Sequence, residues 1–86
     1  MAEAMKTKFE MAVVTKVASL RRQKGLTQDN LAAILEVSRG FIGQVESPNS
    51  PSTYNLNQIN RLAYELGCKI HELLPSESIP EGTWDL

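Results

Sequence analysis

Two short amphipathic segments, separated by only three residues, place the tightest limit on the fold of this chain. The pattern predicts one helix over residues 28–35 and another over 39–46, joined by Glu36, Val37 and Ser38. Each helix has about two turns, which is too short to be stable alone in water. Both must therefore pack on each other and on a larger body. The apolar residues available for this are Leu31, Ala32, Leu35, Ile42 and Val45.

Three further helices are predicted, and no segment has a convincing strand pattern. The first covers about residues 6–24 and ends at Gly25, and a second follows the N-cap Asn55 and ends at Gly67. A short fifth helix is expected before Pro75. The class is therefore all-α, with five helices. The apolar stripes are Met5, Phe9, Val13, Val17 and Leu20, then Leu56, Ile59, Leu62, Ala63 and Leu66, then Ile70, Leu73 and Leu74.

Composition excludes several classes of protein. The chain has 86 residues, enough for one domain, and 42% of them are hydrophobic, which is too many for a disordered chain. Cys68 is the single cysteine, which excludes a disulfide framework and a cysteine-based zinc site. The single histidine, His71, has no ligand at metal-binding spacing, so we expect no metal and no cofactor. The uninterrupted apolar stretches, such as Ala12–Val14, are far shorter than the roughly 20 residues that a membrane span needs, which excludes such a span.

The predicted outward face of residues 39–46 is suited to contact DNA bases. With Ile42 and Val45 facing the core, this face holds Arg39, Gly40, Gly43 and Gln44. Arginine pairs with guanine and glutamine with adenine in the major groove. The amides at the start of residues 28–35, together with Gln28, would suit a phosphate. The alternatives without a role in DNA binding are that Arg39 is a solvated surface residue, that Gln44 is an ordinary exposed glutamine and that Gln28 only caps its helix.

A longer motif surrounds these residues. It comprises Leu20-Arg-Arg-Gln-Lys-Gly-Leu-Thr-Gln-Asp-Asn-Leu-Ala32, followed by Val37, Ser38, Ile42 and Glu46. This pattern resembles the helix-turn-helix of the phage Cro and repressor type, the XRE family, over about residues 10–74. The resemblance implies a lambda-repressor-like DNA-binding domain at residues 1–75, followed by an acidic tail at 76–86.

The resemblance also implies a role for individual residues. Arg39, Gly40 and Gln44 would read bases. Arg21 and Glu46 would form a structural salt bridge. The residues expected at DNA phosphates are Thr27, Gln28, Ser38, Phe41, Asn49 and Ser50.

The chain departs from the family pattern at two places. Pro48 stands where the family usually has glycine, so a phosphate contact through that amide is lost and Asn49 or Ser50 would supply it. Gly40 and Gly43 weaken their helix by roughly 1 kcal/mol each relative to alanine. Either DNA approaches the main chain closely there, or the site is poorly specific.

The resulting expectation is a cytoplasmic, non-enzymatic, sequence-specific transcriptional regulator, a repressor, that binds double-stranded DNA as a homodimer. The alternative is an antitoxin or adaptor whose tail binds a protein partner, because the tail is acidic and contains Trp84. Trp84 would then be an anchor, as tryptophan often is in interfaces; otherwise it is disordered.

Charge is divided unequally along the chain. The net charge is −1, but seven Lys and Arg against five Asp and Glu give +2 in residues 1–50, and two against five give −3 in residues 51–86. The positive half carries the motif. A charge of +2 implies few phosphate contacts for each subunit, and hence a need for two subunits or for close base contacts.

Overall fold

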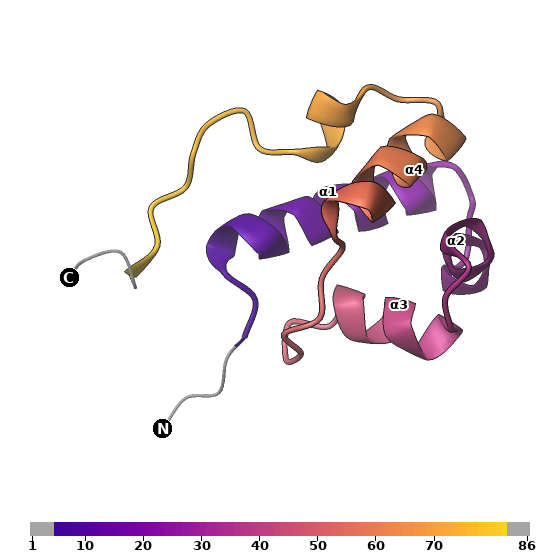
Figure 1. Cartoon of the computed structure of the whole chain (residues 1–86), viewed down its shortest axis with the longest axis horizontal. Helices are drawn as coiled ribbons and strands as arrows, with labels where there is room; N and C mark the ends of the chain where they lie inside the picture. The colour runs from indigo at the N-terminus through magenta and orange to yellow at the C-terminus, as the bar shows by residue number, and fades with distance from the viewer. Residues whose placement is uncertain (1–4, 83–86) are drawn as a thin grey trace.

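The computed structural model describes residues 5–82, and these form a small helical domain (Figure 1). Its elements are α1 (Lys8–Gln23), α2 (Gln28–Leu35), α3 (Arg39–Glu46), α4 (Leu56–Leu66) and the 3-10 helix η1 (Ile70–Leu73). No strand occurs in the described range, which confirms the all-α class. None of its helices is long and apolar enough to cross a membrane.

The predicted fifth helix is a single 3-10 turn, so the count of five α-helices is not confirmed. The segment between Gly67 and Pro75 leaves little room for an α-helix. Leu74, the residue before the proline, has an extended backbone with φ −118° and ψ 149°. A residue before proline is pushed out of the helical region, which stops η1 after four residues.

Helix α1 begins two residues later than predicted because a capping box fixes its start. The Thr7 hydroxyl accepts from the Glu10 amide at 3.0 Å, and the Glu10 carboxylate accepts from the Thr7 amide at 2.9 Å. Phe9 and Met5 were predicted to join the buried stripe, but they are 38% and 47% exposed. The stripe was therefore extended too far, since residue 5 precedes the helix and the buried positions begin at Val13.

Helices α2 and α3 meet at a tight corner whose residues match the prediction. Thr27 and Ser38 are the N-caps of the two helices. Glu36 ends α2 in the left-handed conformation, with φ 58°, and Val37 packs against the core. Figure 1 shows α3 on one side of α1 and η1 on the other.

One buried cluster joins every helix. The side chains that are 1% exposed or less come from all five elements, and α3 packs against α1 and α2. These side chains are Val14, Val17, Leu31, Ile42, Val45, Leu62 and Leu73.

The described part of the C-terminal tail returns to the start of α1. The Glu81 carboxylate accepts hydrogen bonds from the amides of Lys8 and Phe9, at 3.0 and 2.9 Å. These are two of the free amides of the first turn, where a negative charge is favoured. Figure 1 shows the tail passing from η1 back along the molecule toward this end of α1. Trp84 lies outside the described residues.

Candidate nucleic-acid interface

The three predicted base-reading residues lie on one exposed side of α3. Arg39, Gly40 and Gln44 are exposed, whereas Ile42 and Val45 on the opposite side are completely buried. The helix is therefore held by its apolar side and offers its polar side to solvent.

Arg39 reaches from α3 to the first turn of α2. Its Nε lies 3.6 Å from Oδ1 of Asp29, and both side chains are about two-thirds exposed or more, at 67% and 72%. An ion pair this exposed contributes about 0–1 kcal/mol. Its guanidinium can therefore leave Asp29 for another acceptor at small cost.

Arg21 and Glu46 form the expected ion pair, which ties α1 to the end of α3. The Nε and Nη2 atoms of Arg21 donate to the two carboxylate oxygens, each at 2.9 Å. Nη1 donates to the Leu26 carbonyl at 2.9 Å. The two side chains are only 11% and 8% exposed. The pair is therefore bidentate and well shielded from water.

Gln28 belongs to the same network. Its Nε2 donates to Oε1 of Glu46 at 3.0 Å, so its side chain is turned toward the ion pair. Burial raises the pKa of Glu46, but the hydrogen bonds from Arg21 and Gln28 outweigh it and hold that pKa below its usual value. Burial, with Glu46 nearby, raises the pKa of Tyr54, whose buried hydroxyl has no hydrogen-bond partner within the described residues.

Several predicted phosphate-contacting residues also stabilise the α2–α3 corner. The Thr27 hydroxyl accepts from the Asn30 amide at 3.1 Å, and the Ser38 hydroxyl accepts from the Phe41 amide at 3.0 Å. Phe41 is half-buried against the core. Asn49 and Ser50 lie in the loop after α3, exposed and half-buried respectively. The structure thus gathers these residues on α2, α3 and the adjacent loop.

The fold itself does not require glycine at positions 40 and 43. A Cβ at Gly40 would meet only the Ser38 hydroxyl, and one at Gly43 only Oε1 of Gln28, both at 3.8 Å. These are ordinary contact distances, and neither glycine has a positive φ.

The sequence did not predict the contacts of Lys6, whose ammonium lies at the C-terminal end of α3. Its ammonium donates to the main-chain carbonyl of Gln44 at 3.3 Å and to those of Ser47 and Ser50. Burial lowers the pKa of Lys6, and the charge of Glu10 opposes that shift. Its partners are 38 to 44 residues away along the chain, so no local pattern could have identified the contact.

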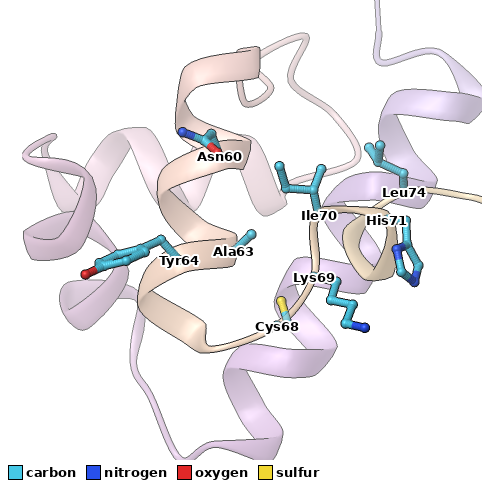
Figure 2. Close-up of a pocket in the computed structure, with 8 residues that line it drawn as sticks. All are labelled: Asn60, Ala63, Tyr64, Cys68, Lys69, Ile70, His71 and Leu74. Atoms are coloured by element: carbon cyan, nitrogen blue, oxygen red, sulfur yellow. The ribbon is translucent and has the colours of Figure 1, made fainter.

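A second, more apolar surface lies on α4 and η1. Figure 2 shows a hollow between them, lined by side chains that include Tyr64 and Ile70. These two are 80% and 46% exposed. Cys68 also lines the hollow, and burial and the charge of Glu72 raise its pKa. His71 is exposed, and residues 5–82 hold no group of three potential metal ligands.

Comparison with solved structures identifies related helix-turn-helix proteins. The restriction-modification controller protein C.AhdI from Aeromonas hydrophila is 30% identical, with a TM-score of 0.63 over 74% of this chain and 94% of that protein. A hypothetical transcription factor from Neisseria, NHTF, is 26% identical, with a TM-score of 0.64 over 87% and 85%. SinR, a master regulator for biofilm formation solved in complex with DNA, is 18% identical, with a TM-score of 0.60 over 71% and 95%.

Other comparisons are narrower. HppE, solved with iron and substrate, has a TM-score of 0.68 at 22% identity, but the chain spans only 38% of its length. That likeness concerns the fold alone. No protein-family model and no curated protein matches the chain.

Proposed function

This chain belongs to the XRE family of helix-turn-helix proteins, and from that membership we propose that it is a sequence-specific DNA-binding transcriptional repressor. The DNA-binding unit is residues 1–75, and residues 76–86 are an acidic tail, of which Glu81 contacts α1. Helix α3 enters the major groove, where Arg39 and Gln44 read base edges and Gly40 lets the main chain approach them.

The observation that supports this proposal most strongly is the amphipathic placement of α3. Its buried side is fixed in the core, and its end is held by the Arg21–Glu46 pair. Its exposed side carries Arg39 and Gln44 at one edge of the molecule. A helix that reads DNA bases must be both rigid and accessible, because misplaced donors miss their base partners.

The phosphate contacts surround this helix. Thr27 and Gln28 lie at the start of α2, Ser38 and Phe41 at the start of α3, and Asn49 and Ser50 in the following loop. Contacts from both ends of a helix-turn-helix fix its register on the duplex without reading sequence.

We propose that two copies act together on a two-fold site. The +2 charge of residues 1–50 is small for a lone DNA-binding subunit. The exposed Tyr64 and Ile70 lie on α4 and η1, not on the helices that carry the proposed DNA contacts. Pairing through that side would leave both copies of α3 free, with half-sites about 34 Å apart.

Selection of bound duplexes from a random-sequence pool tests the proposal. We expect a two-fold consensus, two chains for each duplex, and an affinity that falls as salt rises. Arg39→Ala and Gln44→Ala should each relax the preference at one position of each half-site, at about 1–3 kcal/mol. Absence of salt-sensitive binding to any duplex would refute the function.

A protein-binding role for the tail has less support. Glu81, one of the acidic residues that motivated it, is bonded within the chain to α1. Trp84, the proposed anchor, lies beyond the described residues. No observation in the described part of the chain favours the antitoxin or adaptor reading over direct regulation.

A further inference from the structure

We propose that Lys6 is a positioning residue for DNA binding, which orders the end of α3 and the loop at residues 47–50 without itself contacting DNA. The inference rests on the proposed function, because that loop is where Asn49 and Ser50 would meet the DNA backbone.

The first argument concerns the end of α3. The last carbonyls of a helix lack partners within the helix and carry partial negative charge, so a cation is favoured there. Helix α3 has no basic residue in its own last turn. Pro48 follows one residue after the helix and prevents it from continuing. The ammonium of Lys6 supplies the missing cation from outside the helix.

The second argument concerns the loop. The three carbonyls that accept from Lys6 belong to Gln44, Ser47 and Ser50, so one ammonium joins the helix to both ends of the loop. The other hydrogen bonds there are local: the Asn49 amide donates to the Ser47 hydroxyl at 3.2 Å. Lys6 is thus the long-range contact that fixes this turn.

The third argument concerns the number of donors. A lysine ammonium has three N–H donors and no acceptor. The three carbonyls use all of them, and the side chain is half-buried. A direct phosphate contact would require Lys6 to release a carbonyl. Its contribution to binding should therefore come from the order of the loop.

Two methionine variants separate this role from a charge effect. Lys6→Met keeps the apolar stem and removes the ammonium. Lys8→Met removes the same charge two residues later. The Lys8 side chain is exposed, and the hydrogen bond of this residue with Glu81 comes from its main-chain amide, which the substitution keeps. The comparison is therefore made at equal net charge.

In the DNA-free protein, nitrogen relaxation of the backbone amides of Ser47, Asn49, Ser50 and Ser52 measures the order of the loop directly. We expect order parameters near 0.85 in the wild type and in Lys8→Met, and below about 0.6 in Lys6→Met. Equal order in all three proteins would overturn the inference, whether or not the protein binds DNA.

In the DNA-bound state, affinity for the selected duplex is measured at several salt concentrations. Lys6→Met should bind about five- to tenfold more weakly than Lys8→Met, because the loop must be ordered on binding. Its salt slope should equal that of Lys8→Met. A slope smaller by about 0.9 would identify a lost phosphate contact and overturn the positioning role. A wild type that binds no duplex would instead refute the proposed function.

Discussion

Replacing Glu46 by glutamine removes one negative charge from the link between α1 and α3 and changes little of its shape. The carboxylate accepts two hydrogen bonds from Arg21 and one from Gln28, all at 2.9–3.0 Å. Glutamine offers one oxygen in place of two and turns an amide group toward donors. At least one N–H of the guanidinium would lose its acceptor in a place where water has little access.

The expected cost follows from this burial. The side chains of Arg21 and Glu46 are 11% and 8% exposed, so screening by solvent is weak. Breaking a buried pair by removing one partner typically costs about 3–5 kcal/mol. Because glutamine retains one acceptor, we expect the lower end, about 3 kcal/mol. For a domain of this size that lowers Tm by about 12–24 °C.

Urea unfolding followed by circular dichroism at pH 7 measures the loss. The matched control is Glu65→Gln, whose carboxylate lies 3.0 Å from Arg61 in an exposed pair on α4. Such a pair is worth about 0.3–0.5 kcal/mol, so the control should lose little. Similar losses for the Glu46 and Glu65 variants would refute the claim that burial makes the Arg21–Glu46 pair structurally important.

The pH dependence gives an independent check. The pKa of Glu46 is lower in the folded chain than its ordinary value, so its charge stabilises the fold above the unfolded pKa of about 4.3. This contribution is lost as pH falls through the folded pKa. The stability gap between wild type and Glu46→Gln should therefore be full at pH 7 and narrow below about pH 4.

Two further substitutions test the backbone of the α2–α3 corner. Glu36→Gly should stabilise the fold by up to about 1 kcal/mol in thermal unfolding, because Glu36 has φ 58° and its contact with Arg61 is exposed and 3.9 Å long; a lower Tm would contradict this. Gly40→Ala should stabilise α3 by about 0.5–1 kcal/mol yet weaken binding to the selected duplex, since its Cβ has room in the free protein. Unchanged affinity would contradict close approach of the main chain to DNA.

Local signals predicted most of the fold. Helices α2 and α3 have the predicted bounds, because Thr27 and Ser38 are caps whose partners lie three residues away. The end of α4 is equally local, since Gly67 adopts a positive φ of 69°. The late start of α1 was also readable, as a Thr-x-x-Glu capping box at residues 7–10.

The site was only partly predictable. The ion pair of Arg21 and Glu46 came from the family resemblance, and 25 residues separate the two. The contacts of Lys6 and Glu81 follow from how the finished chain packs. A single lysine or glutamate at the edge of a helical pattern carries no periodicity, so nothing in the sequence distinguishes it from a solvated charge.

The contact of Glu81 with α1 also has an order in time. The ribosome makes Lys8 and Phe9 before Glu81, their carboxylate partner, which follows 72 to 73 residues later. While synthesis proceeds, the first turn of α1 must do without this acceptor. Among the described helices, α1 is made first, and its first turn is completed by a residue made after all of them.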